Sequence, residues 1–383
     1  MTVAVASPGG GASEASADLT NALPAPSVPD GGTSGTVRPA RPRHEYMDVL
    51  TSLAAFCVVW LHSNTLVYTF APTAQWKQSL FVECVAYWAV PIFFMLSGAN
   101  LMGYRDRYST AEFFRHRATK ALIPFLAWCT IAYAEHIWIA DVPLSWSLLS
   151  PRTLYDVYVF QSPMVVYWFF IPLFAIYLAM PVLSLLREHR RVLWFMVVAG
   201  FLTYAILPLA AQLAGVTWNA ALQLPVTAGF VVFPLLGYLL STTNVSLGIR
   251  ILIYVTGSAA CATRYLVTIH LSLPAGKLDT LLFNYLYPPG ALLACAVFLF
   301  VKNCDWARWL RWRPLRTVVT AVSRASLGIY LMHYFIIRDV FPNWGWTLDR
   351  TITRTVGAVV AFLIALTLVS VLQRIPGVRR ILP

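Results

Sequence analysis

The stretch DVLTSLAAFCVVWLHSN, residues 48–64, is apolar and long enough to enter a lipid bilayer, yet it carries His62 deep within it. An ionisable side chain inside a membrane is costly to insert and is usually retained because it acts there. We therefore treat His62 as a candidate functional residue. The alternative interpretation is a histidine that only forms a packing hydrogen bond to a neighbouring helix.

The composition of the whole chain agrees with a membrane location. Of the 383 residues, 58% are hydrophobic and only 11% are charged, whereas soluble domains are usually about one quarter charged. The net charge of +12 does not indicate a nucleic-acid partner, because Lys and Arg are enriched in the cytoplasmic loops of membrane proteins. We expect the lipid bilayer, and no nucleic acid, among the partners of the chain.

Apolar runs close to the ~20 residues that a spanning helix needs recur along the chain. They predict an all-α polytopic membrane protein with about ten transmembrane helices. The predicted spans are residues 47–69, 79–102, 119–140, 164–186, 192–214, 224–241, 249–271, 281–302, 318–341 and 352–374.

The charges of the connecting segments predict the orientation of these spans. With the N-terminus inside, 20 Lys and Arg residues fall in inside segments and six in outside segments. Because positive residues favour the cytoplasmic side, both chain ends are predicted to be inside. We expect a disordered cytoplasmic tail at residues 1–43, a membrane domain at 44–374 and a short basic cytoplasmic tail at 375–383.

Several predicted helices place ionisable groups at one depth in the outer half of the bilayer. His62, Arg264 and His333 lie ~22 Å from the cytoplasmic ends of their helices, with Glu135 at a similar depth and Glu83 near the outer end of the second helix. Mutual pairing around a polar cavity is the arrangement of lowest cost. Arg264 is expected to bind an anion or to neutralise one of the two glutamates.

The chain has no HExxH, Walker or GxSxG motif, so His62 is the main indication of its chemistry. We expect no metal site. A neutral imidazole is a suitable general base for removing a proton from a hydroxyl group near neutral pH. We expect a nearby carboxylate to orient the ring and to stabilise the imidazolium.

A second group of residues lies at the predicted cytoplasmic mouth between the second and third helices. Within GYRDRYSTAEFFRHRATKALIPF, residues 103–125, the basic residues are Arg105, Arg107, Arg115, Arg117 and Lys120. They are suited to the phosphates of a soluble anionic cofactor. The alternative is a topological signal in contact with anionic lipid. A further Trp-rich and Arg-rich run, CDWARWLRWRPLR at 304–316, resembles a basic interfacial segment.

These stretches, in this order, resemble the integral membrane acyltransferases of acyltransferase family 3. YMDVLTSLAAFCVVWLH (46–62) is similar to the family's first helix, which ends in its key histidine. The other similar stretches are VPIFFMLSGANLM (90–102), FFRHRATKALIPF (113–125), YWFFIPLFAIYLAMPVL (167–183) and SLGIYLMHYFI (326–336). Two positions depart from the family pattern, because Thr51 and Tyr167 stand where many members have arginine and histidine.

The resemblance implies transfer of an acyl group, usually acetyl, from acyl-CoA as donor substrate to a hydroxyl acceptor such as a cell-envelope glycan or a lipid-linked sugar. It implies that His62 is catalytic, that Arg115 and Arg117 belong to the donor-side motif, and that the chain is a multi-pass protein of the cell membrane. Since Arg105 and Lys120 belong to the same basic run, we expect all four residues to bind acyl-CoA. No tightly bound cofactor is expected. Two alternatives stay open, a transporter or exporter of such a glycan and an inactive binding protein.

Overall fold

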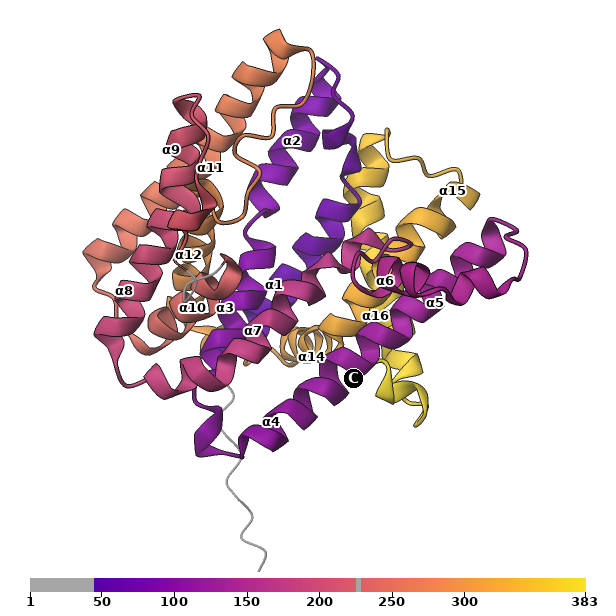
Figure 1. The fold of residues 1–383 in the computed structure, drawn as a ribbon, viewed down its shortest axis with the longest axis horizontal. Coiled ribbons are helices and arrows are strands. Elements are labelled where there is room, and N and C mark those ends of the chain that lie inside the picture. The colour runs from indigo at the N-terminus through magenta and orange to yellow at the C-terminus, as the bar shows by residue number, and fades with distance from the viewer. Residues whose placement is uncertain (1–44, 225–228) are drawn as a thin grey trace, which may run out of the picture. The chain divides into compact units, whose positions relative to one another are not determined.

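The structure is a computed structural model that describes residues 45–224 and 229–383, and every regular element in these ranges is helical (Figure 1). The predicted tail at residues 1–43 lies outside the described residues. The α-helices are α1 (Glu45–His62), α2 (Ala74–Ala86), α3 (Ala89–Leu101), α4 (Thr110–Arg117), α5 (Ile123–Ile139), α6 (Pro151–Tyr158), α7 (Phe170–Leu183), α8 (Arg190–Phe201), α9 (Leu207–Leu213), α10 (Val232–Thr242), α11 (Leu247–Ala275), α12 (Pro288–Asn303), α13 (Trp306–Trp309), α14 (Arg313–Phe335), α15 (Phe341–Asn343) and α16 (Ala358–Leu372).

Each predicted span overlaps one helix or consecutive helices, so the all-α polytopic fold class is confirmed, while the number of about ten transmembrane helices stays a prediction. The span predicted at 281–302 begins before α12, which starts at Pro288, and the span predicted at 224–241 includes residues 225–228, which lie outside the described residues. Six helical stretches are long and apolar enough to cross a membrane, and Gly229–Thr242 and Pro288–Asn303 are shorter apolar helices. The six are Ala74–Asp106, Thr110–Ile139, Val165–Leu186, Arg190–Leu213, Leu247–Ala275 and Thr353–Leu372. The inside location of both chain ends stays a prediction.

The predicted span 79–102 is interrupted between α2 and α3, at residues 87–88. Pro91 explains the position of the break. A proline ring has no N–H to donate and clashes with the carbonyl group four residues earlier, which here belongs to Tyr87. The interruption lets α2 and α3 take different directions, and both helices contribute residues to the cavity described below.

Proline also explains three π-helical turns. Ala118–Leu122, Leu202–Ile206 and Ile336–Val340 each end two residues before a proline, at positions 124, 208 and 342. The wider turn relieves the clash that the proline would make in a regular α-helix, and the chain continues as a helix beyond it. The first of these turns follows Arg117 directly, and the third begins three residues after His333.

Two glycines allow α3 and α10 to approach until their backbones touch (Figure 1). A Cβ atom added at Gly98 would lie 1.8 Å from the carbonyl oxygen of Pro234, and one added at Gly237 would lie 2.0 Å from the carbonyl oxygen of Met95. No side chain fits at either position. Small residues of this kind are the usual means of close helix packing in membranes, and here they fix the position of α3.

Helix α1 is the central helix of the fold, because it contacts α2, α3, α12, α14 and α16. Polar groups fix it against α14 near the start of α1. The Ser323 hydroxyl donates to Asp48 Oδ1 at 2.7 Å, and the Ser52 hydroxyl donates to the carbonyl oxygen of Val319 at 3.1 Å. These contacts set the register between the helix that carries His62 and the helix that carries His333.

Candidate functional site

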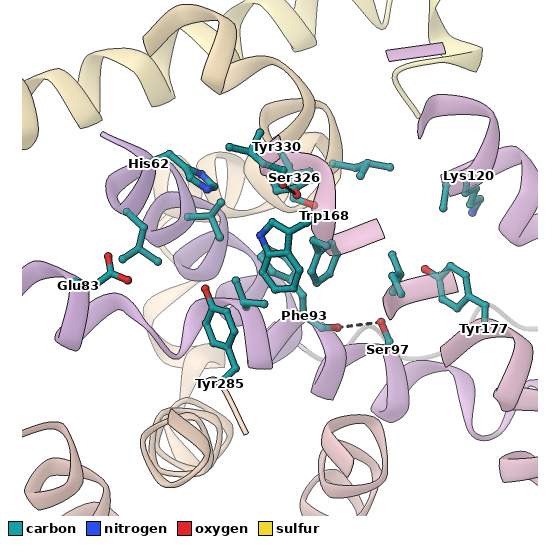
Figure 2. A pocket seen from close by; sticks show the side chains of 18 of the residues that line it. His62, Glu83, Phe93, Ser97, Lys120, Trp168, Tyr177, Tyr285, Ser326 and Tyr330 are labelled. Atoms are coloured by element: carbon teal, nitrogen blue, oxygen red, sulfur yellow. Dashed lines mark hydrogen bonds between the residues drawn. The ribbon is translucent and has the colours of Figure 1, made fainter. Parts of the chain in front are cut away.

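A cavity of about 310 Å³ lies between α1, α2, α3, α7 and α14, and His62 lines it. Figure 2 shows His62 and Glu83 at one end of the cavity, Trp168 in its middle and Lys120 at the other end. Arg117, three residues before Lys120, lines it as well. The cavity therefore joins the two groups of residues that the sequence suggested, the intramembrane histidine and the basic run.

His62 forms a hydrogen bond with His333, a residue of α14 that is fully buried. The distance between His62 Nδ1 and His333 Nε2 is 2.8 Å. The other ring nitrogen of His333, Nδ1, lies 2.7 Å from the carbonyl oxygen of Tyr330 and 3.1 Å from that of Ile329. The predicted orienting role at His62 is thus occupied by an imidazole instead of a carboxylate.

These contacts define which nitrogens carry protons when the two rings are neutral. A carbonyl oxygen only accepts, so His333 Nδ1 carries the proton and His333 Nε2 is left as an acceptor. His62 Nδ1 must then be the donor to His333 Nε2. His62 Nε2 is consequently the ring nitrogen without a proton, which is the form that a general base requires.

Two tyrosines fix the part of α14 that precedes His333. The Tyr167 hydroxyl donates to the carbonyl oxygen of Leu331 at 2.6 Å, and the Tyr330 hydroxyl donates to that of Val166. Tyr167 is fully buried. The departure from the family pattern at position 167 therefore supplies a hydroxyl that attaches α14 to the segment Val165–Phe169, which also carries Trp168.

The other departure, Thr51, does not line the cavity. Its hydroxyl donates to the carbonyl oxygen of Met47 within α1, at 2.8 Å. Two other basic residues, Arg43 and Arg115, are candidates for the role of the arginine that many family members have at this position. Arg43 lies outside the described residues, and Arg115 is exposed and does not line the cavity.

Glu83 lies at the histidine end of the cavity and is almost fully buried. Its Oε1 atom is 3.4 Å from the Tyr68 hydroxyl and 3.9 Å from Arg264 Nη2, while Oε2 has no hydrogen-bond partner in residues 45–224 and 229–383. Arg264 lies behind it, with its guanidinium carbon 3.4 Å from the centre of the Tyr87 ring and 4.4 Å from that of Phe283. The structure therefore places Glu83, rather than Glu135, beside Arg264.

The basic residues separate into two groups in the structure. Arg117 lies between two aromatic rings, with its guanidinium carbon 5.8 Å from the centre of Phe113 and 5.6 Å from that of Tyr177. Lys120 lines the same end of the cavity. Arg105 is bound elsewhere, because its Nε donates to the Ser184 hydroxyl at 2.9 Å and its Nη2 donates to a backbone carbonyl oxygen. Arg105 and Arg115 are not among the residues that line the cavity.

Glu135 also lies away from the cavity. Its carboxylate pairs with Arg338, which in addition donates to Asp339 at 2.7 Å and to the carbonyl oxygen of Pro163 at 3.2 Å. The neighbouring His136 is exposed. Of the candidate cavity residues, His333 and Glu83 therefore lie at the His62 end, Arg264 lies directly behind Glu83, and Glu135 belongs to a separate ion-pair cluster.

Aromatic residues of the cavity wall were not predicted. Trp168 and Tyr285 stack with ring centres 5.7 Å apart, and Tyr285 stacks on Tyr87 at 4.0 Å. Tyr330 lines the cavity three residues before His333. Of these three cavity residues, Tyr330 and Trp168 had a signal in the sequence, because they belong to stretches that resemble the family signatures, whereas Tyr285 had none. Within the described ranges, no group of three or more His, Cys, Asp or Glu residues is arranged to hold a metal ion.

Comparison with known proteins gives one match. A family model described as an acyltransferase domain, that of acyltransferase family 3, matches residues 44–374. Neither a curated protein nor a solved structure was found to match the chain. The matched range contains every residue of the cavity.

Proposed function

The chain belongs to acyltransferase family 3, and from that membership we propose that it transfers an acyl group, most simply acetyl, from acyl-CoA to a hydroxyl group of its acceptor. The observation that carries this proposal is that one cavity joins His62, with its partner His333, to Arg117 and Lys120. A base and an anion-binding group at opposite ends of one cavity suit a donor that is long, anionic at one end and reactive at the other. The protein would act as a multi-pass enzyme of the cell membrane.

In the proposed reaction, His62 Nε2 removes the proton of the acceptor hydroxyl. The hydroxyl oxygen attacks the thioester carbonyl carbon, the new C–O bond forms, and the C–S bond breaks. The CoA sulfur then takes up the proton from the His62 imidazolium, so the net products are the acyl ester and CoA thiol. His333 Nε2 lies 2.8 Å from His62 Nδ1 and stabilises the His62 imidazolium by accepting a hydrogen bond from its Nδ1–H.

The donor would bind with its phosphates at the basic end of the cavity. Arg117 and Lys120 line that end, and guanidinium and ammonium groups are the usual partners of phosphate oxygens. The thin pantetheine arm would follow the cavity past Trp168 toward His62 (Figure 2). A cavity of about 310 Å³ lies at the lower end of the range for small-molecule sites, which favours a short acyl group.

The acceptor would approach His62 beside Glu83. The free Oε2 atom of Glu83 is suited to accept a hydrogen bond from a second acceptor hydroxyl, and the stacked Trp168 and Tyr285 rings offer an apolar surface. Arg264, 3.9 Å from Glu83, balances the charge of the carboxylate. These groups support a neutral acceptor rich in hydroxyl groups, such as a cell-envelope glycan or a lipid-linked sugar.

The competing function is transport or export of a glycan without chemistry, which a polar intramembrane cavity would also permit. Donor dependence separates the two. A transporter has no use for acetyl-CoA, and it should tolerate a change at His62 that preserves the shape of the cavity.

The test uses the purified protein in lipid nanodiscs, with release of CoA thiol from acetyl-CoA as the readout. We expect slow turnover with water as acceptor, a higher rate with added glycan acceptors, and loss of both in His62→Gln. Binding of acetyl-CoA should be unchanged in that variant, which shows that the cavity is intact. Turnover that survives in His62→Gln would contradict the role of the histidine, and absence of acetyl-CoA binding by the wild type would favour the transporter.

A further inference from the structure

The segment that joins α12 to α14, residues 304–316, carries an exposed cluster of tryptophan and arginine side chains that the proposed reaction does not use. Trp309 and Trp312 are 63% and 65% exposed. Four arginines around them are exposed as well: Arg308, Arg311, Arg313 and Arg316. We call these six side chains the Trp–Arg surface.

The Trp–Arg surface is displayed by a backbone that is firmly attached to the fold. On the opposite side of the same segment, the Trp306 indole N–H donates to the carbonyl oxygen of Val301 at 2.6 Å, and Leu310 is buried. The Asp305 carboxylate accepts from the backbone N–H of Arg308 at 3.2 Å and caps α13. One side of the segment thus anchors it, while the other side faces outward.

The four arginines differ from Arg105, Arg187 and Arg190, and resemble Arg115 and Arg191, among the arginines that are predicted to lie on the cytoplasmic side. In the described part of the chain their side chains form no hydrogen bond, ion pair or ring contact. By contrast, Arg105 donates to Ser184, Arg187 pairs with Asp106 and Glu188, and Arg190 donates to Thr242 at 2.8 Å. What distinguishes the four arginines is the pair of exposed tryptophans beside them, Trp309 and Trp312, which a topological signal does not require.

We propose that the Trp–Arg surface binds the headgroups of anionic lipids. Exposed tryptophans favour the interface between headgroups and acyl chains, where their rings are half apolar and their N–H groups find acceptors. Arginine guanidinium groups form strong paired hydrogen bonds with phosphate oxygens. Short amphipathic segments with this composition bind at membrane surfaces, and their binding depends on anionic lipid.

The position of the Trp–Arg surface gives lipid binding a structural consequence. Arg313 is the first residue of α14, and Arg316 follows in its first turn. The same helix carries Tyr330 and His333 in its last two turns. Headgroups bound at the beginning of α14 would fix the depth of that helix in the bilayer, and with it the depth of His333.

The test measures which lipids the full-length protein retains. The purified protein is mixed in detergent with equal amounts of dioleoyl phosphatidylglycerol and dioleoyl phosphatidylcholine, and bound lipid is counted by native mass spectrometry. The wild type should retain phosphatidylglycerol in excess. Changing all four arginines to glutamine should reduce its retention at least about five-fold, because one Lys or Arg near an anionic surface contributes roughly that factor. Retention of phosphatidylcholine should not change.

Three controls make the result interpretable. The same four positions changed to lysine keep the charge and should keep most of the binding. Arg152→Gln with Arg350→Gln removes two exposed arginines elsewhere and should leave the lipid preference unchanged. Each variant should keep its melting temperature within a few degrees, which excludes unfolding as the cause.

Two outcomes would overturn the proposal. One is unchanged retention of phosphatidylglycerol in the glutamine variant. The other is a loss of acetyl-CoA affinity in that variant with lipid retention intact, which would assign these arginines to a soluble phosphate ligand. Loss of lipid retention in the glutamine variant, with folding and acetyl-CoA affinity unchanged, would support the Trp–Arg surface whether or not the protein turns over acetyl-CoA, since the two measurements are independent.

Discussion

Replacement of His333 by leucine tests the histidine pair directly. His62 Nδ1 donates to His333 Nε2 at 2.8 Å, and His333 is fully buried. Leucine has a similar volume but accepts no hydrogen bond. In His333→Leu the N–H of His62 would therefore face an apolar neighbour, and the ring would be free to rotate away from the cavity.

The expected loss follows from the cost of an unpaired buried donor. Leaving such a group without its partner costs about 1–3 kcal/mol. The imidazolium that forms during proton transfer needs this partner more than the neutral ring does, so the cost appears in the transition state. At about 1.4 kcal/mol for each factor of ten, kcat should fall roughly five- to 150-fold.

His333→Gln is the matched variant, because the glutamine carbonyl oxygen reaches the region of the original Nε2 atom and accepts from His62. We expect it to recover most of the lost rate. The assay is release of CoA thiol from acetyl-CoA in nanodiscs, with acetyl-CoA affinity and melting temperature measured for each variant. Equal kcat for the leucine and glutamine variants, with folding and donor affinity preserved, would refute the proposed role of the acceptor nitrogen.

Three further predictions concern packing, donor binding and the position of α14. Gly237→Ala should lower the melting temperature in nanodiscs, because its Cβ would lie 2.0 Å from a backbone oxygen of α3 and overpacking costs about 1–3 kcal/mol or more. Gly248→Ala is the control and should not destabilise the protein, since its Cβ would meet no atom within 4 Å. Arg117→Ala should weaken acetyl-CoA binding about ten-fold by titration calorimetry, whereas Arg105→Ala, whose side chain is bound to Ser184, should change it less than about two-fold. Tyr167→Phe keeps the ring but removes the hydroxyl that donates to α14, so kcat should fall about ten-fold with acetyl-CoA affinity unchanged. An unaltered kcat would show that this hydrogen bond does not position His333.

The fold was largely predictable because the length of the apolar runs is a strong signal in a membrane chain. The interruptions were less predictable. The break before α3 and the π-helical turns depend on how each helix accommodates Pro91, Pro124 or Pro342, and an apolar run has the same appearance whether its helix is regular or interrupted. Hydropathy therefore located the spans and left their internal geometry open.

The candidate site was predictable in part, because the sequence grouped His62 with His333 but did not give the directions of the side chains. His62, His333 and Glu135 were placed at a similar depth from their positions along the predicted spans, and two of them meet in the structure. Glu135 pairs with Arg338 instead, because the direction of a side chain changes by about 100° with each residue of a helix. A small error in a predicted boundary, or a π-helical turn, is enough to turn a side chain away from a cavity.

The histidine pair also has a consequence for the biosynthesis of the protein. A base with a carboxylate partner would place an anion in the middle of a helix during insertion, at a cost of about 2.5–3.5 kcal/mol for Asp on insertion scales. In this chain, α1 and α14 bring one imidazole each, and their contact joins residues 271 positions apart. Each helix can therefore enter the bilayer uncharged at that position long before its partner has been synthesised. Neither helix therefore carries a carboxylate at this position during insertion, and the proposed base gains its partner only when the two helices meet.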